Sequence, residues 1–488
     1  MVQKPAKSNF ENISKLALKI TTRHSFAALM ILLIFGYSCK KETILTDESA
    51  IISISADSLK FDTVFTQTGS VTQSFKIKNS NNQPIVLSSI KLMGGINNPF
   101  KMNVNGVAAT EAIDLSISAN DSIYVFVMVN INPNNTSNPF IVSDSIRIIC
   151  NNNSYHVQLE AYGQNAHFYN SAVISNDTTW TNDLPFVVLG GLTIDSNATL
   201  TLQEGCRVYM HSNAAIMVDG TLKVNGTADQ QIEFAGDRTD DPYRYLPGSW
   251  PGIHFNTSSK NNELNFCSIK NATIGLLIEN PSTNGTPKVT AHQIIIDNAS
   301  EAGLLIENSN ANIDNSLVSN CKKNVVIQGG GNSSFVSCTL TAYPTLYQFH
   351  EFPMLEINNY GFENGNIISR DLKTVFTNCV VWSNSNMIDN EIIVTKEGNG
   401  IFDVLLENSL IKNSTDPNNT TLTNVIKNID PQFDSIDIEN NYFDFRTQNN
   451  LASPLQNTGK LTPFQKDLDN RPRVSGTATD IGCYEKQE

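Results

Sequence analysis

The sequence predicts an all-β protein in which an N-terminal β-sandwich is followed by a long parallel β-helix. Charged residues make up only 16% of the 488 residues. Asn, Ser and Thr, which suit strands and tight turns, take their place. Runs that alternate between apolar and polar residues fill the segment 51–165, and short similar elements recur from about residue 168 to about residue 440. These two patterns predict a sandwich and a stacked coil, respectively.

A basic leader and a short apolar run open the chain. The run Phe26–Tyr37 is too short to span a bilayer and is followed by the small residue Ser38, which is typical of a secretory signal. Cys39 follows directly, and this junction resembles the lipobox of bacterial lipoproteins, although Gly36 stands where the strict pattern has Leu. The resemblance implies that residues 1–38 are a signal peptide and that acyl chains are attached to Cys39. An ordinary secreted protein, cut nearby, is the alternative.

Residues 39–50 would then be a lipidated tether, and the segment 51–165 the first folded part. Phe75–Asn79 alternates strictly between apolar and polar residues, and Asp121–Val129 is a second clear strand. Period-2 runs separated by turn residues are typical of a β-sandwich. The stretch 120–163 resembles the Ig-like modules of many surface proteins, which implies a spacer or a binding platform and no catalytic residues.

Internal repeats dominate the rest of the chain. The hexapeptide Gly275–Asn280 returns at 303–308, and a second element precedes each copy. A repeat of roughly 20–30 residues cannot bury its apolar face alone, but it can when it is stacked into a coil. The first predicted inward column is Ile269, Ile296, Val318, Leu340, Val381 and Ile411, and the second is Cys267, Ile294, Ser316, Cys338, Cys379 and Ser409. Asn271, Asn298 and Asn320 are predicted to stack at one turn, where their amides can hydrogen-bond along the column.

Both ends of this region resemble known proteins. Short strands with Gly turns at 189–205 and 216–226 resemble the opening rungs of right-handed β-helix repeat proteins. Asp467–Arg473 and Asp480–Glu485 resemble the closing motif of the choice-of-anchor Q family, with Cys483 where Ala is usual. The resemblance implies a right-handed parallel β-helix over 168–485 with a C-terminal closing segment. It implies little about chemistry, because this fold hosts lyases, hydrolases, epimerases, adhesins and inert spacers.

The cysteines and the common catalytic motifs indicate no covalent framework or cofactor. Besides Cys39 the chain has seven cysteines and no Cys-x-x-Cys pair, so we expect buried thiols and no set of disulfides. Asp240–Asp241 is the only Asp–Asp pair, and His350–Glu351 lacks the second His of a zinc motif. We expect no cofactor. Bound Ca²⁺ is left open, although Glu279 and Glu307 are better explained as a solvated outward column.

One loop has the composition of a carbohydrate site, in which rings stack on sugar faces and charged groups bind hydroxyls. Its candidate ligand-binding residues are Asp237, Arg238, Asp240, Asp241, Tyr243, Arg244, Tyr245 and Trp250. The alternative is a loop packed on itself, with Trp250 buried in the next strand.

The net charge of -14 argues against nucleic acid as a partner. We expect a non-catalytic cell-envelope lipoprotein, held in the outer membrane by its lipid anchor, with surface display left open. Its β-helix would present a surface to a polysaccharide or a surface protein. The alternatives are a polysaccharide lyase, glycoside hydrolase or epimerase acting along the helix face, and a purely structural spacer. A groove on the helix that gathers three or more Asp, Glu, Arg, Lys, His or Tyr side chains would favour the enzymatic alternative, whereas a spacer predicts no groove and no ligand.

Overall fold

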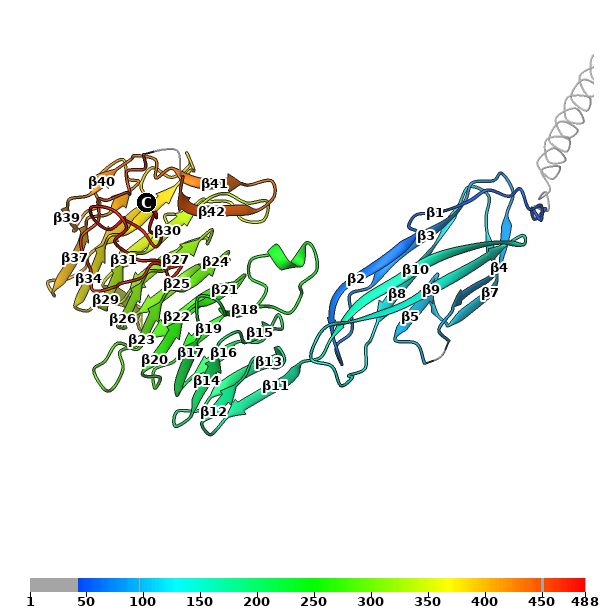
Figure 1. Ribbon diagram of the computed structural model, residues 1–488, viewed down its shortest axis with the longest axis horizontal. Helices are drawn as coiled ribbons and strands as arrows, with labels where there is room; N and C mark the ends of the chain where they lie inside the picture. Colours follow the sequence, from blue (N-terminus) through cyan, green and yellow to red (C-terminus); the bar gives the residue numbers. More distant parts are fainter. Residues whose placement is uncertain (1–42, 96, 449–451, 488) are drawn as a thin grey trace, which may run out of the picture. The chain divides into compact units, whose positions relative to one another are not determined.

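The protein is almost entirely β in the computed structural model, which describes residues 43–95, 97–448 and 452–487 (Figure 1). The chain divides into two compact units, and strands β1–β10 share no sheet with the later strands. No helix within the described ranges is long and apolar enough to cross a membrane. The predicted signal peptide and the predicted lipid-attachment residue Cys39 lie outside the described residues.

Strands β1–β10 form two five-stranded sheets with antiparallel pairing. The first sheet has the order β1 (Ile52–Ile54), β3 (Gln73–Asn79), β8 (Ser122–Val129), β5 (Phe100–Val104) and β6 (Val107–Ala108). The second has the order β2 (Ser58–Phe65), β10 (Asn153–Gln164), β9 (Phe140–Cys150), β4 (Ile85–Leu92) and β7 (Glu111–Ile117). Phe75 and Ile77 of β3 are buried between exposed neighbours, as the alternation predicts. The Ig-like resemblance of this part stays a prediction.

The remaining strands form a parallel β-helix with three strand stacks, which we call faces A, B and C. Face A comprises β15 (Arg207–Met210), β18 (Ile232–Gly236), β21 (Cys267–Lys270), β24 (Ile295–Asp297), β27 (Leu317–Ser319), β30 (Thr339–Ala342), β35 (Val380–Ser383), β38 (Leu410–Ile411) and β40 (Ile426–Lys427). Face B comprises β16 (Ile216–Val218), β19 (Ile253–Phe255), β22 (Ile274–Glu279), β25 (Ala302–Glu307), β28 (Val325–Gln328), β31 (Leu355–Asn358) and β36 (Ile392–Thr395).

Face C comprises β12 (Thr178–Trp180), β14 (Thr199–Gln203), β17 (Thr221–Asn225), β20 (Asn262–Asn265), β23 (Val289–His292), β26 (Ala311–Asp314), β29 (Gly331–Val336), β34 (Leu372–Thr377), β37 (Phe402–Glu407) and β39 (Thr421–Thr423). Strands β11 (His167–Ile174) and β13 (Phe186–Ile194) begin the coil, and β13 pairs with both β15 and β16. The short strands β32 (Tyr360–Glu363) and β33 (Asn366–Ser369) form an antiparallel hairpin in one inter-rung loop.

The strand register confirms the predicted inward column on face A. Ile269 lies opposite Ile296, which lies opposite Val318, and the series continues through Leu340, Val381 and Ile411. All of these side chains are buried in one continuous apolar core. The second predicted column is buried as well, so equal repeat positions do stack rung upon rung.

The asparagine column forms between its first two members. Asn271 and Asn298 both have a φ of 60°, in the left-handed region that Asn tolerates. The Asn298 side chain donates from Nδ2 to Oδ1 of Asn271 at 2.7 Å. Asn320, also left-handed with a φ of 52°, instead donates to Asp297 at 3.2 Å.

The closing segment covers part of the outside of face A. The strands β41 (Phe433–Asp437) and β42 (Tyr442–Thr447) form a hairpin, and the described residues 452–487 contain no regular strand (Figure 1). Outward-facing side chains of face A, including Leu317, Val380 and Leu410, join Phe433, Phe445, Leu455, Leu468, Ile481 and Cys483 in a second apolar core. The later rungs of face A are therefore buried on both sides.

Candidate functional site

The early rungs of face A, which we call the open end of face A, carry polar side chains on their outer surface. Register places Tyr209, Ala235, Lys270 and Asp297 in one outward column, with Glu233 on the neighbouring column. The same column becomes covered at Trp382, which belongs to the second core. The change from covered to polar positions along one strand stack leaves a recess at the open end.

Lys270 is the charged centre of the recess. Its Nζ lies 4.0 Å from Oε1 of Glu233, and its side chain is 46% exposed. Asp297 sits opposite Lys270 on the next strand and accepts a hydrogen bond from Ser319 Oγ at 2.7 Å. Burial raises the pKa of the Asp297 carboxyl, whereas the hydrogen bond from Ser319 and the positive charge of Lys270 lower it by less. One ammonium between two carboxyl groups makes a nearly neutral site rich in donors and acceptors.

Tyr209, on β15, is the first residue of the outward column. Burial raises the pKa of its phenol, and the nearby Glu233 carboxylate acts in the same direction. The phenol therefore stays protonated at neutral pH and can donate a hydrogen bond.

The loop 237–250 lies beside the recess and is tied down to the asparagine column. Asn271 donates from Nδ2 to the backbone oxygen of Arg244 at 2.7 Å, and Asn298 donates in the same way to Tyr245 at 2.8 Å. The Ser249 backbone N–H donates to the backbone oxygen of Asn271 at 2.8 Å. The turn residues of two successive rungs thus fix the single 3-10 turn η1 (Tyr243–Tyr245) of the described chain.

The predicted charged residues of the loop pair mostly with one another. Arg238 donates two hydrogen bonds to the Asp240 carboxylate, at 2.7 and 2.8 Å, and its guanidinium lies 3.5 Å from the ring centroid of Tyr243. This pairing holds the pKa of Asp240 below its ordinary value. Arg244 contacts Asp241 at 2.9 Å. Such bidentate and stacked contacts orient the loop and leave the other surface of Tyr243, which is 42% exposed, facing outward.

Asp237 and Trp250 take other roles. The Asp237 carboxylate is 2.7 Å from Nδ1 of His211, at the foot of the loop. Trp250 is fully buried, and its indole N–H donates to the backbone oxygen of Lys270 at 2.9 Å. No external ligand can stack on the Trp250 ring, so the aromatic surface of the loop consists of Tyr243 and Tyr245.

The stacked glutamates do not form a metal site within the described part of the chain. Glu279 and Glu307 lie opposite each other on β22 and β25, and Gln328 of the next rung donates to Glu307 at 3.1 Å. Across residues 43–95, 97–448 and 452–487 no group of three or more His, Cys, Asp and Glu side chains is arranged to hold a metal ion.

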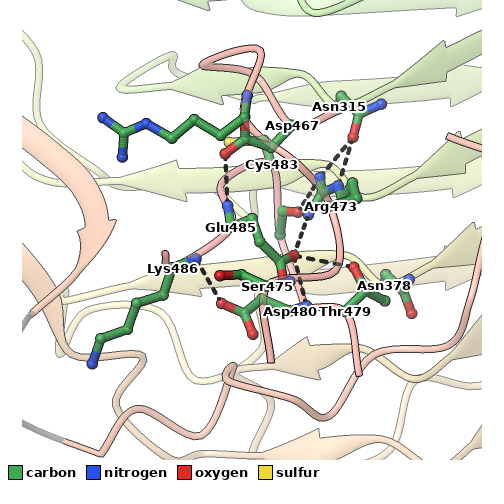
Figure 2. A network of polar contacts seen from close by, with 12 residues as sticks. Asn315, Asn378, Asp467, Arg473, Ser475, Thr479, Asp480, Cys483, Glu485 and Lys486 are labelled. Atoms are coloured by element: carbon green, nitrogen blue, oxygen red, sulfur yellow. Dashed lines mark hydrogen bonds and ion pairs between the residues drawn. The ribbon is translucent and has the colours of Figure 1, made fainter. Parts of the chain in front are cut away.

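A second cluster of charged groups lies in the closing segment (Figure 2), where Asp467, Arg473, Asp480 and Glu485 are buried. Arg473 donates to Asn315 Oδ1 and lies 3.6 Å from Glu485 Oε2. Glu485 also accepts the backbone N–H of Asp480 at 2.9 Å, and Asp467 accepts the backbone N–H of Glu485 at 2.9 Å. Burial raises the pKa of Glu485 to about 7 and also raises the pKa values of Asp467 and Asp480. This cluster fastens the closing segment to the coil.

Sequence reasoning found the loop but missed its strand-borne partners. Glu233, Lys270 and Asp297 come from three different rungs, and none belongs to a recognisable motif. The available signal was their position, because each is a charged residue at an outward place of a repeat whose inward places are apolar.

The fold and the site together define a parallel β-helix protein with a polar recess on one outer face. No protein family matches the sequence, and no curated protein matches it. Some solved structures share short or loose similarity with the chain. A family 123 glycoside hydrolase from Clostridium perfringens is 14% identical over 25% of this chain and 31% of its own, with a TM-score of 0.18. The SafA pilin of Salmonella enterica with its SafB chaperone is 14% identical over 24% and 56%, with a TM-score of 0.17.

A GH87 α-1,3-glucanase catalytic unit from Streptomyces thermodiastaticus is 9% identical over 73% of this chain and 89% of its own, with a TM-score of 0.14. The chain spans less than two thirds of the first two structures. Similarity this low shows nothing about activity.

Proposed function

We propose that the protein is a cell-envelope lipoprotein that binds a neutral polysaccharide at the open end of face A without cleaving it. The observation that carries the proposal is the recess in which Lys270, Glu233 and Asp297 adjoin the exposed ring of Tyr243. Protein-bound sugars need ring faces for stacking and mixed donors and acceptors for their hydroxyls. Because the positive and negative charges of the recess nearly balance, the recess favours a neutral polysaccharide over an acidic one.

The lipid anchor and the outer-membrane location belong to the same proposal. Acylation at Cys39 would hold the folded parts at a membrane surface through the tether 39–50. The recess gathers more than three acidic, basic and tyrosine side chains, which argues against a pure spacer and also supports the enzymatic candidate below.

The proposal is tested by a glycan array probed with residues 40–488, in which bound glycans are also examined for cleavage. We expect binding to neutral glycans and intact chains after long incubation. Changing Tyr243 and Tyr245 together to Ala should weaken retention, since both are tied to the recess by the loop. Unchanged retention in this variant would place the glycan elsewhere.

A polysaccharide lyase, hydrolase or epimerase is the second candidate. The observation in its favour is the raised pKa of Asp297 beside Lys270, because burial that raises the pKa of a carboxyl group makes it better suited to general acid catalysis. Shortened or unsaturated products in the array wells, lost in Asp297→Asn, would establish this candidate in place of the binding protein.

A further inference from the structure

The outer surface of the first N-terminal sheet carries an apolar stripe on its central strand. Along β8, Ile123, Val125 and Val127 are buried, so the alternating residues point outward. These outward residues are Tyr124, Phe126 and Met128, which are 42%, 38% and 38% exposed. Antiparallel sheets with one solvated face normally carry polar side chains there. Three large apolar side chains in a row therefore indicate a contact surface.

The rings of the stripe are held in a defined arrangement. The centroids of Tyr124 and Phe126 are 5.6 Å apart with an interplanar angle of 13°. Lys76 is the cross-strand neighbour of Tyr124 on β3, and its Nζ lies 4.8 Å from the centre of that ring. Cross-strand pairing thus places a cation directly beside the aromatic stripe.

The sheet that carries the stripe contains no acidic residue in any of its five strands. Its charged residues are Lys76 and Lys78 on β3 and Lys101 on β5, and all three are exposed. Asp121, at the start of β8, accepts the backbone N–H of Ser122 at 2.7 Å. The rest of the chain brings the net charge to -14, so this face is locally cationic in an acidic protein.

A hollow beside the stripe gives the surface a shape. Its lining includes Phe126 and Met128 of β8, Lys101 and Asn103 of β5, and Ala108 of β6. The hollow has a volume of about 440 Å³, and every lining residue belongs to the N-terminal unit. Gly106 borders it with no other residue within 4 Å of the place a Cβ would take. The hollow offers apolar surface with an ammonium group at its edge.

We propose that this sheet face binds an acidic polysaccharide, with sugar rings against Tyr124, Phe126 and Met128 and their carboxylates paired with Lys76, Lys78 and Lys101. The apolar C–H faces of a pyranose match the stripe, and the three ammonium groups match a repeating negative charge. A discrete hollow fits a sugar unit better than the flat surface of a lipid bilayer does. The site is separate from the recess on face A and differs from it in the charge of its ligand.

Affinity electrophoresis of residues 40–488 in gels containing polygalacturonate tests the proposal, with dextran as the neutral probe. We expect retardation by polygalacturonate that falls at least tenfold in Lys76→Gln/Lys101→Gln and in Phe126→Ala, and that weakens as salt is added. These side chains point into solvent, and circular dichroism checks that each variant is folded. The matched controls lie on the second sheet: Lys91→Gln, whose partner is Glu111, and Tyr162→Ala, whose ring is 40% exposed. Both should bind like the unchanged protein.

Two results would overturn the proposal. The first is that polygalacturonate retards the face variants as strongly as it retards the unchanged protein. If Lys270→Ala then abolishes this retardation, the acidic glycan binds in the recess on face A. The second is absence of binding to polygalacturonate together with lysine-dependent co-sedimentation with phosphatidylglycerol vesicles, which would make the face a membrane contact. Loss of neutral-glycan binding in Lys270→Ala with polygalacturonate binding retained would leave both proposals standing.

Discussion

Arg473 donates two hydrogen bonds to Oδ1 of Asn315, at 2.9 and 2.6 Å, across 158 residues of sequence. Asn315 follows β26 of the coil, whereas Arg473 lies in the closing segment. The same guanidinium donates to the backbone oxygen of Gly482 at 2.8 Å and faces the Glu485 carboxylate. One buried cation therefore joins the coil to both halves of the closing motif (Figure 2).

Replacing Arg473 by Ala should destabilise the protein by about 3–5 kcal/mol, because it leaves buried carboxyl groups without their cation. Urea unfolding followed by tryptophan fluorescence and circular dichroism measures the change. The control is Arg471→Ala, whose side chain is 50% exposed and lies 3.8 Å from Asp469, and which should cost at most about 1 kcal/mol. Equal effects of the two substitutions would contradict the structural role of Arg473.

Stability should fall as pH rises from about 4.5 to about 7. Burial raises the pKa of Glu485 from its ordinary 4.5 to about 7, so the folded state binds more protons than the unfolded state in this window. The raised pKa values of Asp467 and Asp480 act in the same direction. We expect a loss of the order of 1–3 kcal/mol, with an allowance for screening.

Glu485→Gln isolates this effect because it keeps the size of the side chain and removes its charge. The variant should match the unchanged protein at pH 4 and exceed its stability at pH 8, as measured by urea midpoints. If attraction to Arg473 outweighed burial, the order at pH 8 would be reversed.

The asparagine column should control the loop 237–250. Asn298→Gly keeps the left-handed backbone but removes the side-chain hydrogen bonds to Asn271 and to the backbone oxygen of Tyr245. This loss should lower the free energy of unfolding by about 1–2 kcal/mol. Asn298→Ala should cost about 1 kcal/mol more, because its φ of 60° strains an Ala residue. Both variants should be cut faster by trypsin at Arg244. Asn320→Gly, which removes no bond to the loop, is the control and should leave that cleavage rate unchanged.

The repeats made the core of the coil predictable, because equal repeat positions must stack. Ile269, Ile296 and Val318 lie opposite one another as expected. The cover on face A was not predicted, although Leu317 and Val380 are apolar at outward positions. A strand that is buried on both sides loses its period-2 pattern, so the sequence does not show which apolar residues face outward.

The site was only half predictable for a related reason. Composition singled out the loop with Tyr243, since rings, carboxylates and guanidiniums gather there within a short stretch. Lys270 and Glu233 are far apart in sequence and meet only because consecutive rungs stack. Trp250 is an aromatic residue of the same stretch, as Tyr243 and Tyr245 are, so composition alone did not separate it from them. It pairs with Ala272 in a parallel bridge and its side chain is buried in the core.

All seven cysteines of the described chain are buried and free, which confirms that they act as small apolar residues. Burial raises the pKa of Cys206 to about 11, so little thiolate is present at neutral pH. In a Cys39→Ser variant we expect no reaction with Ellman's reagent in the native state and seven reactive thiols in denaturant. Five thiols would instead indicate a disulfide, for which Cys338 and Cys379, on consecutive rungs of one inward column, are the candidates.

Lys270→Ala should reduce the affinity for a neutral glycan at least tenfold while leaving the fold intact. Lys270 is 46% exposed and contributes little to stability, but it supplies the central donors of the recess and balances Glu233 and Asp297. The matched control is Lys223→Ala on face C, which removes an outward lysine paired with Glu263 at 2.6 Å. Isothermal titration with the best ligand from the array measures both variants, and unfolding midpoints confirm that neither is misfolded. Equal losses of affinity in the two variants would mean that general surface charge attracts the glycan, whereas a loss confined to Lys270→Ala locates binding at the open end of face A.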